Sequence, residues 1–185
     1  MPEQKPQKSG PAPWQIPVAA EEVAEAGAHF DLVADAGVRE AVAAVAGLRD
    51  LPRLEAHFDV ARREPGGLHV TGVVVATVGQ ECVVTLEPLS SEIEETVDVR
   101  FMPAGAPTRP ARGAEVKPHD PSWDDPEPLI GGAIDLGALA TEFLILGINP
   151  YPRKPGAVFD PPQDGKPEAG PFAALAKLTK DQDVR

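Results

Sequence analysis

The chain has 185 residues and a mass of 19.5 kDa, enough for one domain of ordinary size with extra length for tails. Its formal charge is −12, which disfavours a basic protein that coats the phosphates of nucleic acids. No apolar run is long enough to cross a membrane, and residues 1–15 lack the apolar core of a secretory signal. The single cysteine, Cys82, excludes an internal disulfide and is typical of a reducing compartment. We therefore expect a soluble, cytoplasmic protein.

Proline is frequent, with 22 residues, and most of them lie in the segments 1–17, 103–128 and 150–171. Because proline lacks a backbone donor and fixes φ, these segments do not belong to the interior of a sheet or helix. We predict a disordered N-terminal arm over residues 1–17 and a single α+β domain over residues 18–156, with a proline-rich loop at 103–128. A linker and a short amphipathic helix occupy residues 157–185.

A helix followed by a hairpin opens the predicted domain. Asp35 suits the N-cap of the helix and Gly47 its left-handed C-terminal cap, with valines at helical spacing between them. Apolar and polar residues then alternate over residues 53–60, which predicts a strand with one buried face. A turn at residues 64–67 and a β-branched run over residues 68–78 complete an antiparallel hairpin.

Further strands are predicted over residues 82–86 and 93–101, and an additional early strand around residues 28–34. Residues 135–147 predict a second helix that is apolar on nearly every side, and hence buried on nearly every side against the sheet. The predicted fold class is α+β. It comprises an antiparallel sheet of four to five strands, open or barrel-like, packed with two helices. A flexible proline-rich N-terminus, an acidic loop and a C-terminal tail complete the chain.

Motifs for catalysis are absent from the sequence, including those for phosphate, dinucleotide, catalytic zinc and calcium binding. The neighbouring carboxylates Glu94–Glu95 and Asp124–Asp125 are interpreted as solvated surface, since adjacent residues on a strand point to opposite faces. We therefore predict no enzymatic activity, no catalytic residue and no small-molecule substrate.

Cysteine and histidine also give no indication of a metal site or cofactor. Cys82 has Glu81 and Glu87 as neighbours, which would raise its pKa, so we interpret it as a small apolar residue in a buried strand. A structural zinc ion needs four ligands. The four histidines are scattered along the chain: His29, His57, His69 and His119.

Charged residues suggest two kinds of partner. The basic residues that could bind RNA directly are Arg53, Arg62, Arg63, Arg153 and Lys154. They are interleaved with acids or lie in an exposed loop, so an ordinary solvated surface is the alternative interpretation. Residues 14–38 and 81–98 contain acids but no Lys or Arg, and such surfaces repel nucleic acid and can attract basic proteins.

The C-terminal segment 171–180 is predicted to form a short amphipathic helix that begins at Pro171. Its partner-binding side chains are predicted to be Phe172, Leu175, Leu178 and Lys177. Ten residues are too few to hold a helix alone in water. The helix must therefore dock on its own domain or in the groove of a partner.

Three segments resemble the YceD family of large ribosomal RNA subunit accumulation proteins. Residues 81–88, Glu-Cys-Val-Val-Thr-Leu-Glu-Pro, lie where that family has a Cys-x-x-Cys after the hairpin. Residues 134–147 resemble its Ile-Asp-Leu helix, and residues 170–178 its near-terminal Pro-Phe-x-x-Leu-x-x-Leu. Thr85 replaces the second family cysteine, so a metal site of the family does not carry over to this chain.

The resemblance spans about residues 48–180 and implies a bacterial protein that supports the accumulation of large-subunit (23S) ribosomal RNA. It makes a ribosomal protein or a pre-ribosomal particle the expected partner, with ribosomal RNA as a further candidate. We therefore expect a non-enzymatic ribosome biogenesis factor whose body and C-terminal helix bind this partner. The alternative is direct RNA binding through the basic residues named above.

Overall fold

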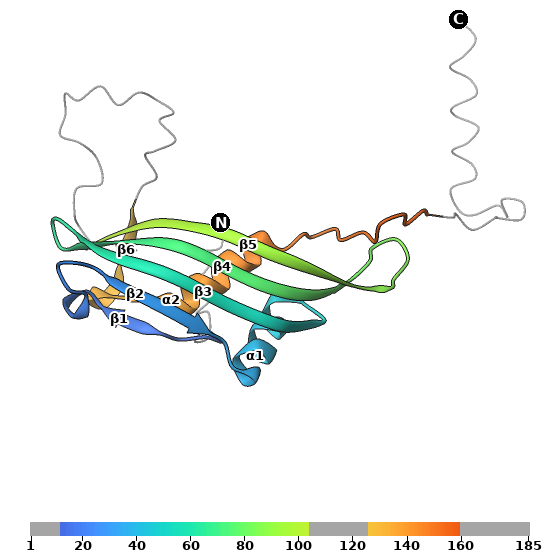
Figure 1. Ribbon diagram of the computed structural model, residues 1–185, viewed down its shortest axis with the longest axis horizontal. Coiled ribbons are helices and arrows are strands. Elements are labelled where there is room, and N and C mark those ends of the chain that lie inside the picture. Colours follow the sequence, from blue (N-terminus) through green and yellow to red (C-terminus); the bar gives the residue numbers. More distant parts are fainter. Residues whose placement is uncertain (1–11, 104–125, 160–185) are drawn as a thin grey trace, which may run out of the picture.

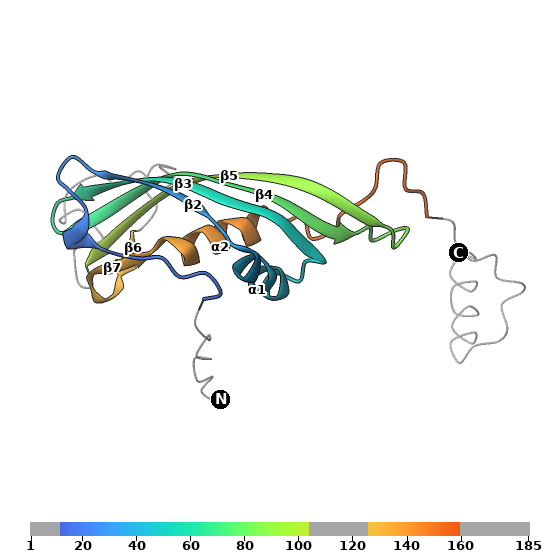
Figure 2. The same cartoon turned by 60° about the horizontal axis from the view of Figure 1, so that its bottom comes forward.

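A long sheet of five strands, covered on one face by two helices, forms the body of the protein (Figures 1 and 2). The computed structural model describes residues 12–103 and 126–159. In spatial order the sheet contains β2 (Ala28–Val33), β3 (Asp50–Arg63), β4 (Gly67–Glu81), β5 (Pro88–Pro103) and β6 (Glu127–Leu129). A second sheet pairs β1 (Pro17–Ala19) with β7 (Ala133–Asp135). The helices are α1 (Ala36–Ala46) and α2 (Leu136–Gly147), with short 3₁₀ turns η1 (Ala20–Glu22) and η2 (Ile130–Gly132).

The α+β class is confirmed, but the expectation of a purely antiparallel sheet is partly wrong. Strands β2 to β5 are antiparallel neighbours, whereas β6 runs parallel to β5. A parallel neighbour requires a connection longer than a hairpin turn, and residues 104–126 provide that length. A barrel-like closure is also wrong, because β2 and β6 lie at opposite edges of an open sheet.

Helix α1 has the two caps that its sequence predicts. The Asp35 side chain accepts a hydrogen bond from the backbone N–H of Val38 (2.8 Å). Gly47 adopts a left-handed conformation (φ 66°), and its N–H bonds to the carbonyl of Ala43. A residue with a Cβ would be strained in this conformation, so glycine ends the helix at low cost.

Helix α2 is fixed to the first strand by one carboxylate. Asp135 Oδ1 accepts hydrogen bonds from the backbone N–H groups of Gly137 and Ala138 (both 3.0 Å), which caps the helix. The same oxygen accepts the N–H of Ile16 (2.8 Å), just before β1. The expected burial of the helix on nearly every side is wrong at its C-terminal end. There Ile145 and Leu146 are 41% and 71% exposed, because the sheet covers only one side of the helix.

The core lies between the sheet and α2. The predicted alternation on β3 is confirmed, since its inward side chains are fully or almost fully buried: Leu54, Ala56, Phe58 and Val60. Strand β4 contributes Val70, Val74, Ala76 and Val78 from the same face, and α2 contributes Leu136, Leu139, Ala140 and Leu144. One face of each central strand is therefore apolar and the other is available to solvent.

The strand predicted over residues 82–86 is wrong, because these residues form the turn between β4 and β5. The N–H of Leu86 bonds to the carbonyl of Cys82, and the N–H of Cys82 bonds to the carbonyl of Glu87 (both 2.9 Å). Leu86 has a left-handed backbone (φ 57°), which reverses the chain direction. Strand β5 therefore begins at Pro88, earlier than its alternating pattern indicates.

Candidate protein-interaction surface

One face of the five-stranded sheet is open. Helices α1 and α2 and the β1–β7 sheet lie on the same side, and no described element packs on the other side (Figure 2). We call this second side the outer face. Its histidine and charged side chains are His29, Asp31, Arg53, Glu55, His57, Asp59, Arg63, His69, Glu92, Glu94, Asp98 and Arg100. The charged residues of the outer face are therefore mixed in sign.

Hydrogen bonds between histidine and aspartate connect β2 to β3 on the outer face. His29 places Nδ1 2.8 Å from Asp59 Oδ1 and Nε2 3.2 Å from Asp31 Oδ1. His57 Nδ1 also bonds to Asp31 Oδ1. The pKa of His29 is raised above 6.5, first by the bond to Asp59 and then by the bond to Asp31. The pKa of Asp31 is lowered, mainly by its bond to His57. Carboxylates in this part of the face are therefore already partnered.

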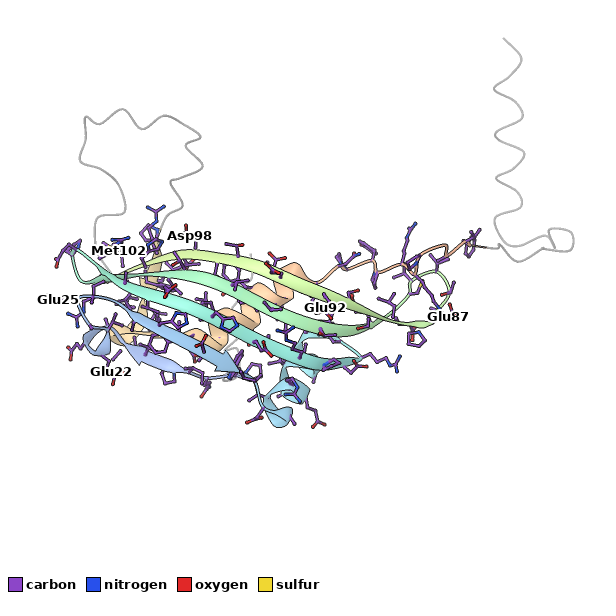
Figure 3. The ribbon with its side chains drawn as sticks, viewed as in Figure 1. Glu22, Glu25, Glu87, Glu92, Asp98 and Met102 are labelled. Carbon is purple, nitrogen blue, oxygen red and sulfur yellow. The ribbon has the colours of Figure 1, made fainter. Side chains whose placement is uncertain are left out.

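Strand β5 differs from the rest of the sheet because it is acidic and has only the short edge strand β6 beside it. It contains four acidic residues, Glu92, Glu94, Glu95 and Asp98, and one basic residue, Arg100. Figure 3 shows Glu92, Asp98 and Met102 spread along this strand, with Glu87 in the turn that precedes it. The sequence identifies the acidic segment 81–98, but its position at an edge depends on the strand order, which the sequence does not show.

Two of the β5 carboxylates have partners on the neighbouring strand. Glu92 accepts a hydrogen bond from the Thr77 hydroxyl (2.8 Å), and Asp98 accepts one from His69 Nε2 (2.7 Å). Glu94 and Glu95 make no hydrogen bond or ion pair with any residue of the described ranges. Glu94 is exposed, so its negative charge is available to a partner, whereas Glu95 is half-buried beside α2.

The edge of β5 is unpaired over most of its length in the described part of the chain. On one side β5 pairs with β4 from Pro88 to Phe101 without a bulge. On the other side it pairs with β6 only over Phe101–Pro103. Residues 88–99 are therefore bordered by a described strand on one side alone. We call this stretch the free β5 edge.

Two of the predicted RNA-binding residues lie at the hairpin between β3 and β4. Arg62 donates from Nε to the carbonyl of Val23 (2.6 Å) and from Nη2 to the carbonyl of Glu21 (2.8 Å). It therefore fastens the segment around η1 to the sheet. Arg63 donates to His69 Nδ1 (3.2 Å) on the outer face.

The other predicted basic residues lie toward the opposite end of the sheet. Arg53 forms an ion pair with Glu55 (2.7 Å), and Lys154 forms one with Glu87 (3.1 Å). Arg153 is exposed beside Lys154, in the segment that packs on the β4–β5 turn. The five residues thus form two separated groups, and three of them already bind carboxylate or carbonyl oxygens.

The predicted burial of Cys82 is confirmed, but the residue lies in the β4–β5 turn and not in a strand, and its sulfur accepts hydrogen bonds. Its buried Sγ lies 3.3 Å from the N–H of Lys154 and 3.5 Å from the N–H of Thr85. These donors, Lys154 first, lower the pKa of the thiol from 9.0 to about 6. The expected increase from Glu81 and Glu87 is therefore wrong, because hydrogen bonds to the sulfur and not the neighbouring carboxylates determine the direction of the shift. Cys82 thus joins the turn to the chain that follows α2.

Cys82→Ala is expected to remove a pH-dependent part of the stability. The folded thiol ionises near pH 6, whereas the unfolded thiol keeps its proton up to about 9.0. The contribution of Cys82 is therefore fully present above pH 9 and is lost as the pH falls through 6. Urea unfolding of both proteins across this range should show a stability difference that grows with pH. A difference that is constant with pH would contradict a thiolate at this position.

The predicted partner-binding residues of the tail, Phe172, Leu175, Leu178 and Lys177, lie outside the described residues, as does His119. Within residues 12–103 and 126–159, no three His, Cys, Asp or Glu side chains are grouped so that they could hold a metal ion. None of the helices in those ranges has the length and apolar character needed to cross a bilayer.

Comparison with known proteins identifies one family. Residues 70–179 match the family described as "Large ribosomal RNA subunit accumulation protein YceD". The match covers more than half of the chain and includes β5, α2 and the turn that contains Cys82. No match was found among curated proteins or among solved structures.

Proposed function

Since the chain belongs to the YceD family of large ribosomal RNA subunit accumulation proteins, we propose that it supports this accumulation by binding and not by catalysis. The partner in this proposal is a basic ribosomal protein, free or within a pre-ribosomal particle. The observation that carries the proposal is the acidic β5, where Glu94 and Glu95 have no partner among the described residues. Proteins of the ribosome neutralise RNA and are therefore rich in the charge that such a surface attracts.

The arrangement of charges favours a protein partner over bare RNA. The phosphates of an RNA brought to the outer face would be repelled by the β5 carboxylates. Basic residues offset such repulsion only where several of them lie close together. The predicted RNA-binding residues are instead divided between the two ends of the sheet, and Arg62 is engaged with the carbonyls of Glu21 and Val23. Direct RNA binding is therefore the alternative that the ribonuclease experiment below tests.

The C-terminal helix predicted from the sequence supplies a second contact in this proposal. Phe172, Leu175 and Leu178 would enter an apolar groove of the partner, and Lys177 would lie at the rim. A helix this short gains its order from the surface on which it docks. Binding through an acidic body and an apolar tail together would raise the affinity above that of either contact.

The double variant Phe172→Ala, Leu175→Ala is expected to lose most of its co-sedimentation with large-subunit precursor particles, while its thermal unfolding midpoint stays unchanged. Two anchoring side chains of a helix-in-groove contact are removed, and no core residue is altered. The matched control is Phe159→Ala, which removes an aromatic side chain that is 68% exposed and precedes the predicted helix. The measurement is gradient sedimentation of lysate with the tagged full chain.

Two results would contradict the proposal. A lower unfolding midpoint would show that the tail packs on its own domain. Co-sedimentation that survives the double variant would remove the tail from the interface. The parallel experiment captures partners with and without ribonuclease. If ribonuclease releases every partner, and retention of precursor RNA on a filter falls steeply with salt, direct RNA binding replaces the proposal.

A further inference from the structure

We propose that the free β5 edge binds an extended segment of a protein partner as an additional strand, and that this segment alternates basic and apolar residues. The inference rests on the proposed function and specifies the partner surface for it. Addition of a strand to a sheet edge derives affinity from main-chain hydrogen bonds and specificity from alternate side chains. Both contributions have a counterpart on β5.

The backbone of the free β5 edge is regular and long enough to accept a strand. The register between β4 and β5 is constant from Leu68–Phe101 to Glu81–Pro88, so no bulge turns the edge away. No proline interrupts residues 89–102. The opposite edge, β2, has only six residues, and short edge strands are a common protection against pairing. The free β5 edge has neither that protection nor the lysines that often block an edge.

The short strand β6 shows that this edge accepts a partner and which backbone groups face it. β6 pairs with Phe101–Pro103, in register with Met102 opposite Pro128. In each opposed pair of a parallel ladder, only one residue directs its N–H and C=O toward the other strand. Pro128 has no N–H, so Met102 is the residue whose backbone groups face β6. The side toward which the backbone N–H and C=O point alternates from one residue to the next along a strand. The N–H and C=O of Thr96, an even number of residues from Met102, therefore point to the free β5 edge. An added strand would lie beyond Glu127, the residue at which β6 begins.

The outer side chains of β5 select basic residues in the added strand. Glu92, Glu94 and Asp98 are exposed on the outer face, and even-numbered spacing along the strand places all three on that face. Opposite charges on neighbouring strands stabilise the pairing, and like charges destabilise it. A second copy of the chain, paired antiparallel through the same edge, would bring acidic outer positions together, for example Glu94 opposite Asp98 when Thr96 lies opposite Thr96. This argument favours a basic segment over self-association.

The inner side of the edge is bordered by an apolar surface of α2. Leu139 and Glu142 line a hollow together with Phe101 and Pro128, so this side of the helix faces β5 and β6. Leu146 follows Leu139 by two helical turns and lies on the same side. It is 71% exposed, although a side chain at the next residue, Gly147, would collide with Ile93 and Glu95 of β5. Inward apolar residues of an added strand would cover Leu146.

The inference is tested with the full chain and an acetylated, amidated peptide of alternating lysine and valine. Thr96→Pro removes one edge N–H and leaves the β4 side of the ladder intact, since proline is tolerated on an edge. Thr96→Val is the matched control that keeps the N–H. We expect Thr96→Pro to reduce the affinity for the peptide by about tenfold, as measured by fluorescence anisotropy, and Thr96→Val to leave the affinity unchanged. The variant Glu92→Gln, Glu94→Gln, Asp98→Asn should bind weakly and remain folded.

Amide hydrogen exchange locates the peptide. We expect new protection at even-numbered residues from 92 to 98 when it binds. Equal binding by Thr96→Pro and Thr96→Val would overturn the inference. So would protection of these amides before peptide is added, because the chain itself or a second copy would then occupy the edge. Co-sedimentation separates the two proposals. If precursor particles bind Thr96→Pro as well as the unmodified chain, the edge contact is disproved and the proposed function stands. If the particles do not bind even the unmodified chain, the proposed function is disproved.

Discussion

Phe58→Ala is expected to lower the free energy of unfolding by about 3–5 kcal/mol. Phe58 is fully buried near the middle of β3. In register it lies between Phe30 of β2 and Gly72 of β4, where it joins the short edge strand to the centre of the sheet. Truncation to alanine removes apolar contacts and leaves a cavity that rigid strands on both sides cannot close. Urea unfolding monitored by circular dichroism measures the loss.

The matched control is Phe30→Ala on the neighbouring strand. Phe30 is only partly buried, so its truncation should cost less than that of Phe58 although the chemical change is identical. Equal losses at the two positions would show that the β2–β3 side of the sheet carries as much of the core as its centre. The ranking of the two variants thus tests where the core lies.

The parts of the fold that depend on nearby residues could be predicted from the sequence. The alternation over residues 53–60 identifies Phe58 as an inward residue, because the side chains of a strand change face at every step. Asp35 and Gly47 identify the ends of α1 for an equally local reason, since each bonds to a backbone group within four residues. Asp135 identifies the start of α2 in the same way.

The parts of the structure that depend on residues distant in the sequence could not be predicted from it. The role of Arg62 follows from carbonyls about forty positions earlier, which no local pattern indicates. The thiol of Cys82 receives the N–H of Lys154, 72 residues later in the chain, and this donor reverses the expected direction of its pKa shift. The acidic segment 81–98 was visible as composition, but only the order of strands shows that it forms a free edge.

The free β5 edge and the outer face therefore make different demands on a partner. The outer face offers side chains whose charges are partly balanced by neighbours, as between His29 and Asp59. The edge offers backbone groups that only an extended chain can reach, with carboxylates on either side of them. A folded basic domain could approach the first, whereas a linear segment fits the second. This difference makes a peptide a fair probe for one surface and a poor one for the other.

Gly72→Ala is expected to lower the free energy of unfolding by about 1–3 kcal/mol, because the methyl group has no room in the centre of the sheet. An ideal Cβ at Gly72 would collide with the backbone carbonyl oxygen of His57 and lie 2.9 Å from Cδ1 of Phe58. The carbonyl cannot rotate away without breaking the ladder between β3 and β4. Chemical unfolding measures the loss. The control Gly37→Ala, in the first turn of α1, meets only Asp35 at 3.4 Å and should be neutral or stabilising.

Combining Gly72→Ala with Phe58→Ala distinguishes the two collisions. Removal of the Phe58 ring relieves the contact at 2.9 Å, but the carbonyl of His57 stays where the ladder holds it. We therefore expect most of the cost of Gly72→Ala to persist in the Phe58→Ala background, with a modest coupling energy in the double-mutant cycle. If Gly72→Ala costs nothing in that background, the ring alone excludes the side chain, and close approach of the two backbones is not the reason for glycine in β4.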